Sequence, residues 1–489
     1  MNSCQELLQF NSFINQRNTP TKPHCALDTE LDDWRHVARN STLSGGSLIG
    51  RSGQLFNFDL ADKLVAVRQR LAGGSSAGVF KGMATLALGS GLAKIIGLLS
   101  IQVLTRIYSP EHFGIFSIFT AMLLILTPLM TLRYELAVPL PSRDGAAMTL
   151  MTVSAALLLL MTLLLGALLW LAGPVLLAMV SMEAITPYRG LLILALFLTG
   201  LYEVLQIWAV RRRAYPIIAR TQLQQSIIGA IAKIALGVAG LMPLGLLAGH
   251  VTGAGAGLMA LVRAFRADVK RFWRHVTLKR AWTMLRHYRS FPTYRLPAQM
   301  LQIFSSQSPL LMTAALYDAG TTGQLGLALM MLALPMNLLG YTTSKAYYAE
   351  IASLGRKRPA EIRAVTRSVI KRLLALSLAP ALVLLALGED IFALAFGAQW
   401  ALAGQLAAIL AIYLLFQFIH APASHLLSLF DRQRLLLLLN VQRTALTVAC
   451  FTAAYLLEWP ITSVILLYSV TLSTHYLFSL LMSLRVIPR

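Results

Sequence analysis

The stretch MATLALGSGLAKIIGLLSIQVLT (residues 83–105) contains a single charged side chain, Lys94. A helix of about 20 apolar residues is long enough to cross the hydrocarbon core of a bilayer, which is about 30 Å thick. The stretch cannot cross as a lone strand, because lipid offers no hydrogen-bond partner to a free strand edge. It is therefore predicted to be a membrane-spanning helix.

Eleven further apolar runs of similar length follow. The ninth run is short, and an additional apolar stub at 173–182 is assigned to an extracytoplasmic loop. The chain is thus predicted to be an all-α polytopic membrane protein with about 12 transmembrane helices, and an even number of helices permits a repeat of six plus six. The eleven runs are 115–132, 148–171, 190–210, 217–241, 244–262, 296–316, 324–342, 373–388, 401–422, 435–456 and 461–484.

Composition excludes an ordinary soluble enzyme. Of the 489 residues, 57% are hydrophobic and only 13% are charged, whereas soluble proteins carry about 25% charged residues. Three cysteines without a C-x-x-C pair give neither a disulfide framework nor a metal site. The chain also lacks a P-loop and an H-E-x-x-H motif. No catalytic residue, metal or cofactor is therefore expected.

The distribution of basic residues predicts the orientation in the membrane. If the N-terminus is cytoplasmic, the inner loops hold 28 basic residues and the outer loops hold two, Arg106 and Arg189. Such a bias is the positive-inside signal, and a miscounted helix would destroy it. We therefore expect a multi-pass membrane protein with both termini cytoplasmic. The net charge of +22 then faces an anionic leaflet and not a nucleic acid.

Four segments are expected along the chain. Residues 1–82 are polar, with nine basic and seven acidic side chains, and are interpreted as a flexible cytoplasmic extension or as the product of an early start codon. Helices 1–6 (83–262) would form an N-lobe and helices 7–12 (296–489) a C-lobe, joined by the basic cytoplasmic linker 263–295. A weak internal similarity supports the repeat: Tyr108 precedes Gly114 by six residues, and Tyr317 precedes Gly323 by the same number.

Four ionisable residues lie well inside predicted helices: Lys94, Glu203, Lys233 and Arg443. Charged groups are costly in hydrocarbon and usually face a cavity or a partner. Because three are basic and one is acidic, internal pairing cannot neutralise them all, and the surplus positive charge suits an anionic substrate. The alternatives for Lys94 and Lys233 are a structural salt bridge to Glu203 or snorkelling, and the alternative for Arg443 is snorkelling to the interface.

Polar stripes at helical spacing predict the walls of a central cavity. Arg295, Gln299 and Gln302 share one face of the seventh helix, and Gln102 lies on the face of the first helix that carries Lys94. These positions are expected to contact the head group or sugars of the substrate. Small residues on the same faces have another interpretation, since they also allow membrane helices to pack closely.

Arg133 and Glu135 follow the second predicted helix and are expected to belong to a cytoplasmic gate. Two residues apart on a helix, they would point to different sides and could not pair with each other. Each is therefore expected to bond to another element, with the basic loop 343–372 as the opposite wall. The alternative is that Arg133 serves only to fix topology.

Several motifs resemble a known family. These are GSGLAK (89–94), LTRIYSPEHFG (104–114), LRYELAVPLP (132–141) and Trp208-x-x-Arg211. They are similar to the bacterial oligosaccharide flippases, the lipid-linked oligosaccharide translocases of O-antigen and exopolysaccharide pathways in the multidrug/oligosaccharidyl-lipid/polysaccharide exporter superfamily. The resemblance covers roughly 83–485. It implies a protein of the bacterial inner (cytoplasmic) membrane with two six-helix lobes around a central cavity, and a substrate carried on undecaprenyl diphosphate.

The resemblance implies translocation by alternating access and no enzymatic activity. The expected partners are the lipid-linked oligosaccharide, membrane lipids, H⁺ or Na⁺ as a coupling ion, and polysaccharide polymerase or export machinery. One alternative is an ion-driven multidrug exporter, which should carry acidic cavity residues for organic cations. The other is a membrane glycan polymerase or ligase, which the short predicted outer loops disfavour.

Overall fold

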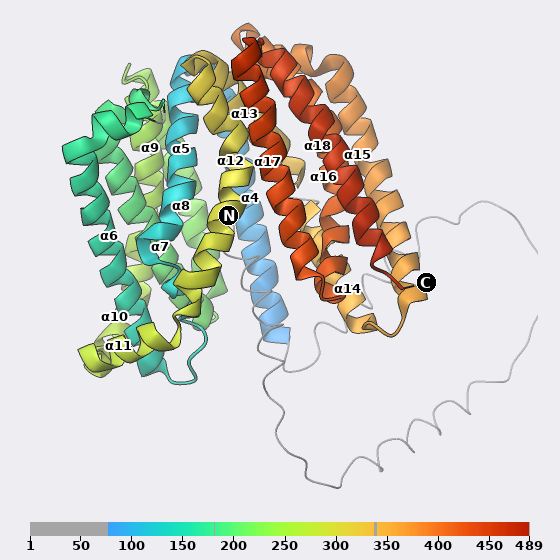
Figure 1. The fold of residues 1–489 in the computed structure, drawn as a ribbon. Coiled ribbons are helices and arrows are strands. Elements are labelled where there is room, and N and C mark those ends of the chain that lie inside the picture. The colour runs from blue at the N-terminus through green and yellow to red at the C-terminus, as the bar shows by residue number, and fades with distance from the viewer. Residues whose placement is uncertain (1–76, 180, 337–339, 489) are drawn as a thin grey trace, which may run out of the picture. The chain divides into compact units, whose positions relative to one another are not determined.

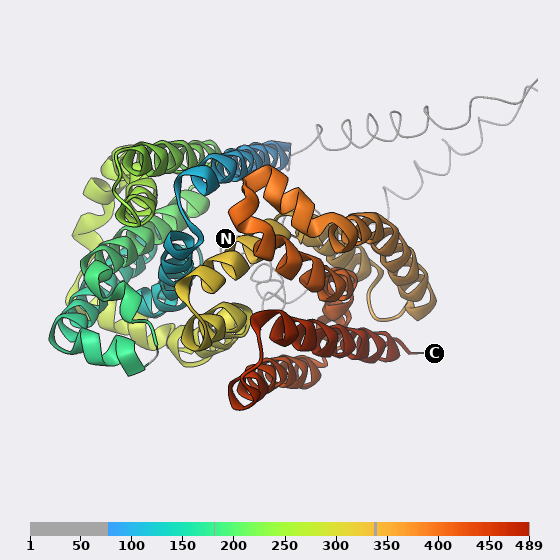
Figure 2. The same ribbon diagram turned by 90° about the horizontal axis from the view of Figure 1, so that it is seen from above.

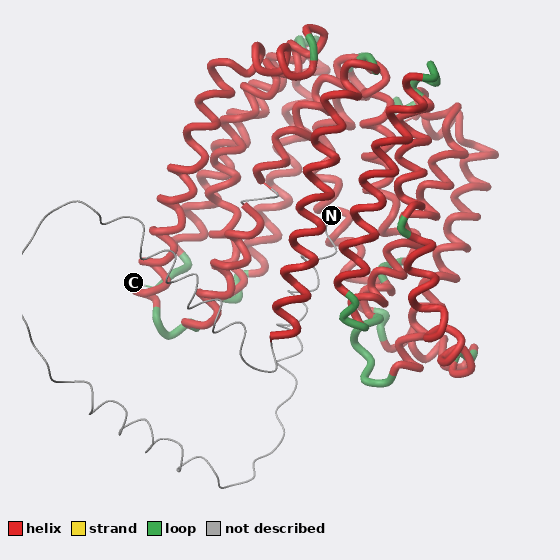
Figure 3. The backbone as a smooth tube through the Cα atoms, turned by 180° about the vertical axis from the view of Figure 1, so that it is seen from behind, coloured by secondary structure: helices red, strands yellow, loops and turns green. Residues whose placement is uncertain are grey.

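A computed structural model describes residues 77–179, 181–336 and 340–488. This part of the chain is almost entirely helical and contains no strand, with short loops mainly at helix ends (Figure 3). The longer helices are α4 (Ala77–Ile107), α5 (Pro110–Thr131), α6 (Asp144–Met179), α7 (Arg189–Arg211), α8 (Tyr215–Val238), α9 (Leu244–Ala256), α10 (Leu258–Phe272), α11 (Leu278–His287), α12 (Leu296–Leu316), α13 (Ala319–Pro335), α14 (Tyr341–Leu354), α15 (Pro359–Phe396), α16 (Ala401–Leu429), α17 (Gln433–Leu457) and α18 (Ile461–Arg485).

Each of the twelve predicted runs is helical over most of its described residues, which confirms the all-α polytopic fold. Nine helical segments in the described residues are long and apolar enough to cross a membrane. The three predicted spans outside that set are α8, α12 and α13. The first two are 24 and 21 residues long but carry several glutamines and serines, and α13 is apolar but short. Lower hydropathy is expected of helices that turn a polar face inward.

The helices form two groups. In Figure 1, α6, α7, α10 and α11 lie on one side, α14 to α18 lie on the other, and α5 and α12 lie between them. Figure 2 shows the same separation along the helix axes. The central helix α5 is mostly buried, whereas few residues of α4 and α15 are buried. Leucines exposed along α15, such as Leu382 and Leu385, are the surface expected toward lipid.

Several predicted boundaries were wrong because helices continue past the hydrocarbon-length runs. Helix α4 begins at Ala77 rather than at 83. The stub assigned to a loop at 173–182 is helical as far as Met179, which makes α6 36 residues long. The short ninth run is the middle of α15, which has 38 residues. Apolar length marks only the lipid-crossing part of a helix, so the basic first turns of α15 were missed and the apolar end of α6 was taken for a loop.

Two predicted loops are also helical. The linker 263–295 contains most of α10, the whole of α11 and a π-helical turn, Phe291–Arg295. The region 343–372, expected to be a basic loop, consists of α14 and the first turns of α15. Arg356, Lys357 and Arg358 lie in the short loop between α14 and α15, and the other basic residues of region 343–372 lie on these two helices. The remainder of the N-terminal extension, residues 1–76, lies outside the described residues.

Candidate functional site

A sharp turn after α5 brings Arg133 and Glu135 together. Leu132 and Arg133 both have left-handed backbone angles, with φ of 49° and 62°. This conformation is uncommon for residues other than glycine, and it redirects the chain into a 3₁₀ turn at Tyr134–Ala137. As a result, Arg133 Nη1 lies 2.9 Å from Glu135 Oε1. The prediction that these two residues cannot pair was wrong, because it assumed a continuous α-helix.

Arg133 also contacts Glu203 of α7, with 3.3 Å between Nη1 and Oε2. Arg133 and Glu135 are buried, so one guanidinium contacts two acidic groups inside the first half of the bundle. This geometry differs from the expected partner in region 343–372, since Glu135 and Glu203 both belong to the first half. Arg133 therefore occupies the carboxylate of Glu203, which was considered as a partner for Lys94 or Lys233.

The region around this cluster holds polar atoms whose hydrogen-bonding capacity is unused. In the described residues, Glu135 Oε2, Thr131 Oγ1 and both side-chain amide atoms of Gln299 are buried without a hydrogen-bond partner. Leaving such a group unsatisfied costs about 1–3 kcal/mol. Gln299 follows the π-helical turn Phe291–Arg295, which packs on the 3₁₀ turn that carries Glu135. Unsatisfied groups of both halves therefore lie near the end of the bundle that carries Arg133 and Arg295. We call this the Arg-rich end.

Lys94 and Lys233 lie on the tightly packed pair α4 and α8. A Cβ on Gly89 would lie 2.5 Å from Ala219 Cβ, and Ser226 Oγ donates to the carbonyl of Ala93 at 2.6 Å. Seven residues separate Ser226 from Lys233, or about 10 Å along a helix. The two lysines therefore stand at different depths and are not brought together.

Lys233 lies against an aromatic ring. Its Nζ is 5.0 Å from the ring centroid of Phe116 on α5, a favourable cation–π distance. Its stem packs against Gly249 of α9, and His250 also contacts Phe116. Lys94 is half-buried. Within the described residues, neither lysine has a carboxylate within ion-pair distance.

Arg443 occupies a corresponding polar position in the second half. Its Nε donates to Ser305 Oγ of α12 at 2.9 Å, and its Nη1 donates to the hydroxyl of Tyr476 at 3.3 Å. Tyr413 stacks on Tyr476 with 6.3 Å between ring centroids, and Tyr468 packs edge-on against Tyr413 at 5.5 Å. All partners of the guanidinium among the described residues are neutral.

The sequence interpretation missed Tyr468 and Tyr476, although their spacing of eight residues places them near one face of a helix. The remaining predicted cavity residues are spread along the bundle. Gln102 and Gln302 are exposed on α4 and α12, Arg295 is half-buried in the π-helical turn, and Gln299 is buried.

The opposite end of the bundle, at the N-terminal ends of α5 and α13, is closed by backbone contact between the halves. A Cβ on Gly114 would collide with the carbonyl of Ala319, and a Cβ on Gly323 would collide with that of Pro110. Both helices are capped at the residue before them, Ser109 and Asp318 respectively. The repeated six-residue spacing between Tyr and Gly therefore marks equivalent positions, Gly114 and Gly323, that pack on each other.

Further contacts across the halves support this closed end. The carbonyl of Thr105 on α4 accepts from Gln399 Nε2 at 2.8 Å and from Trp400 Nε1 at 3.1 Å. Arg106 Nη2 donates to the carbonyl of Leu394 at 2.9 Å. Trp400 is fully buried and packs edge-on against Phe113. We call this contact region, from Thr105 to Gly114 and from Ala319 to Gly323, the closed end.

These features define a multi-pass membrane protein with the architecture of flippases and exporters. The chain belongs to the family described as polysaccharide biosynthesis protein, which matches residues 103–404. No curated relative matches the chain. The family match bears out the resemblance found in the sequence.

Solved structures share the fold at low identity. An inward closed conformation of the lipid II flippase MurJ aligns with a TM-score of 0.64 and 13% identity, over 82% of this chain and 88% of that one. An inward-facing multidrug resistance MATE family transporter of the MOP superfamily aligns with a TM-score of 0.61 and 14% identity, over 80% of this chain and 94% of the transporter.

Proposed function

We propose that this protein translocates oligosaccharide units linked to undecaprenyl diphosphate across the bacterial inner membrane, for surface or exopolysaccharide biosynthesis. The mechanism is alternating access and involves no covalent step. The family, described as polysaccharide biosynthesis protein, and the fold shared with a lipid II flippase support transport of a lipid-linked saccharide.

The observation that carries the proposal is the surroundings of three cations inside the bundle. Lys94, Lys233 and Arg443 have no carboxylate within ion-pair distance among the described residues, and Glu203 instead contacts Arg133. A buried charge is expensive unless it is paired. An anionic head group such as a diphosphate would supply the missing partner, and Arg binds phosphate oxygens well because of its planar fork of donors.

The other side chains in the bundle suit a saccharide. Gln102 and Gln302 are exposed amides, Gln299 has unsatisfied buried donors and acceptors, and the tyrosine cluster around Arg443 offers aromatic faces and hydroxyl groups. The prenyl chain can stay in lipid while the polar head moves between the halves.

The closed end supports an alternating-access cycle. If the Arg-rich ends of the helices face the cytoplasm, as the positive-inside bias predicts, the contact between α5 and α13 seals the extracytoplasmic side. Rocking of the two halves about the fixed cations would then open that side. Arg133 and Glu135, at the other end, are proposed as part of the cytoplasmic gate.

A multidrug exporter for organic cations is the rival within the same fold. Such a site needs carboxylates free to face the drug, but Glu135 and Glu203 both contact Arg133. The arrangement therefore favours an anionic substrate over a cationic one.

The proposal is tested by following radiolabelled lipid-linked oligosaccharide in a strain from which the gene has been deleted. The expected result is accumulation of the labelled lipid on the cytoplasmic face, relieved by the wild-type gene. Normal movement of the lipid in the deletion strain, together with increased sensitivity to organic cations, would instead support drug export.

A further inference from the structure

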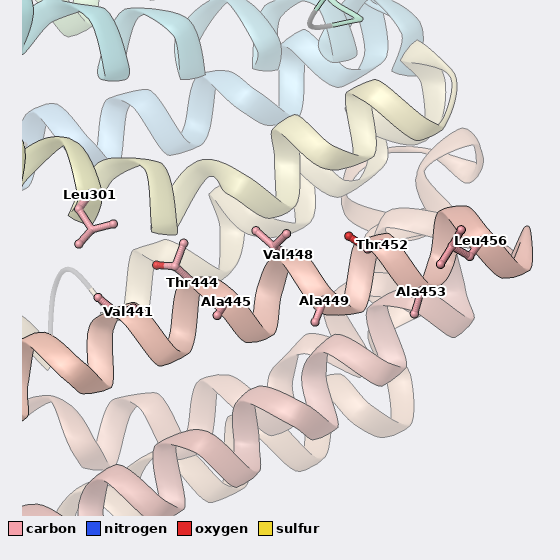
Figure 4. A pocket seen from close by; sticks show the side chains of 9 residues that line it. All are labelled: Leu301, Val441, Thr444, Ala445, Val448, Ala449, Thr452, Ala453 and Leu456. Atoms are coloured by element: carbon pink, nitrogen blue, oxygen red, sulfur yellow. The ribbon is translucent and has the colours of Figure 1, made fainter.

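A long apolar groove runs along one face of α17. It has a volume of about 690 Å³ and is lined by Leu301 of α12 and eight residues of α17 (Figure 4). The α17 residues are Val441, Thr444, Ala445, Val448, Ala449, Thr452, Ala453 and Leu456. They recur every three or four residues, so they form one helix face. From Val441 to Leu456 the groove extends about 22 Å along the helix axis, most of the hydrocarbon thickness of about 30 Å.

The groove is a feature in which the two halves differ. Helices α12 and α17 are the first and fifth spans of the second half, as α4 and α8 are of the first. The pair α4 and α8 closes through contacts of Gly89 with Ala219 and of Ala93 with Ser226. Ala445, Ala449 and Ala453 of α17 would allow a similarly close approach, yet they line a groove instead. The second half therefore leaves open a surface that the first half fills with a helix.

A cation on the side of α17 opposite the groove indicates what kind of molecule would lie at the seam between α12 and α17. Arg443 is only two residues from Val441, and its partner Ser305 is one helical turn from Leu301. By helical geometry, Arg443 lies about 160° around α17 from Ala445. The seam between α12 and α17 therefore has an apolar face on the groove side and a cation on the other. An amphiphile with an anionic head and a long hydrocarbon chain matches this arrangement.

We propose that the groove holds the isoprenoid chain of the lipid carrier while its diphosphate lies near Arg443. This inference rests on the proposed function, because it assigns a place to the apolar part of the same substrate. The chain would lie along α17 parallel to the membrane normal, with the head group on the inner side of the seam. The polar head could then move between the halves without drawing the chain out of lipid.

The test uses the full-length protein in lipid nanodiscs with a photoactivatable polyprenyl diphosphate that carries no sugar. Irradiation is expected to label the peptide that contains Ala445 to Leu456. Excess unlabelled polyprenyl diphosphate should displace the label, whereas the same excess of phosphatidylglycerol should not. Equal displacement by phosphatidylglycerol, or labelling spread evenly over lipid-facing helices, would overturn the proposal.

A second experiment fills the groove with a larger side chain. Ala449→Phe should reduce labelling of α17 at least fivefold and slow translocation of the long-chain substrate. Ala386→Phe is the matched control, because Ala386 lies on α15 among exposed leucines and outside the groove, and it should leave both unchanged. Normal labelling and transport by correctly inserted Ala449→Phe would contradict the groove assignment while leaving the flippase proposal intact. Failure of the wild-type protein to move any lipid-linked oligosaccharide would contradict the flippase proposal itself.

Discussion

Gly114 and Gly323 pack backbone to backbone across the two halves: a Cβ on Gly323 would lie 2.7 Å from the backbone nitrogen of Gly114. Each glycine lies five residues after the residue that precedes its helix, Ser109 before α5 and Asp318 before α13. Equivalent positions of the two halves thus form the contact. Such a contact tolerates no side chain, so its stability should depend on both glycines.

The first prediction concerns this contact. Gly323→Ala should destabilise the closed end, because the added methyl group collides with the carbonyl of Pro110. Overpacking of this kind costs about 1–3 kcal/mol, which corresponds to a shift of about 5- to 150-fold between two conformations. The reporter is a cysteine replacing the buried Thr105, in a protein whose three native cysteines are replaced by serine. Its labelling by an impermeant maleimide should increase.

Gly190→Ala provides the control for that substitution, since a Cβ there meets nothing within 4 Å. It should leave labelling of the cysteine at position 105 at the starting level. If Gly323→Ala also leaves that cysteine protected, the glycine contact does not hold this end closed.

The second prediction concerns the cluster of Arg133, Glu135 and Glu203. Arg133→Ala should be the most destabilising single substitution, by about 3–5 kcal/mol, because it removes the shared partner of two carboxylates. Glu135→Gln should cost less, because Arg133 keeps its contact with Glu203. Thermal unfolding in detergent measures the order, and a larger loss for Glu135→Gln would show that the cluster is not centred on Arg133.

The proposed gating role of Arg133 and Glu135 requires a separate measurement. Glu135→Lys places two cations side by side and should open the Arg-rich end. Cysteines placed at Gln102 and Gln302 should then be labelled faster from the cytoplasmic side. Unchanged labelling at both positions would leave Arg133 and Glu135 without a role in gating.

The third prediction concerns Lys94 and Lys233. Replacing either with Gln should lower the translocation rate about tenfold, the equivalent of about 1.4 kcal/mol, while membrane abundance stays normal. Lys→Arg should restore part of the rate. Because the lysines stand at different depths, their effects should multiply in the double variant. Normal rates for both Gln variants would show that the charges have no part in transport.

The fourth prediction concerns the cap of α13, outside its membrane-spanning part. Partial burial raises the pKa of the Asp318 carboxyl, but hydrogen bonds from the Thr321 hydroxyl and amide outweigh it and hold this pKa below the ordinary value of 3.8. The stabilisation is therefore present near neutral pH and is lost as the pH falls through the lowered pKa. Asp318→Ala should cost about 1 kcal/mol.

Asp318→Asn separates the charge from the cap, because Asn also caps helices well. This variant should keep most of the stability at neutral pH, and its melting temperature should change less than that of the wild type below about pH 4. The same acid sensitivity in both proteins would assign the loss to other carboxylates.

The sequence predicted the twelve helical runs because lipid imposes a length and an apolar composition that can be counted. It also pointed to Lys94, Lys233 and Arg443, since a charge inside an apolar run stands out. The basic first turns of α15 were missed because polar helix beyond the hydrocarbon carries no such signal. The end of α6 is apolar and was wrongly assigned to a loop, because the preceding run already had the length needed to cross the bilayer.

Side-chain pairing was harder to predict than the helices. Arg133 and Glu135 pair only because Leu132 and Arg133 adopt left-handed angles, and no glycine or asparagine in the sequence marked that turn. The contacts of Arg443 with Ser305 and Tyr476 join residues more than 30 positions apart. The contact between Gly114 and Gly323 was visible only as a repeated spacing, whose meaning depended on how the two halves pack.

The most direct test of the account is translocation of a fluorescent lipid-linked oligosaccharide by the purified protein in liposomes. Movement of the label between leaflets is measured by its loss of fluorescence when a membrane-impermeant reductant is added outside. We expect the wild-type protein to move the lipid, and the triple variant K94Q/K233Q/R443Q, reconstituted to the same density, to move it at least 100-fold more slowly. Equal rates for the two proteins would contradict the claim that these three cations carry an anionic head group across the membrane.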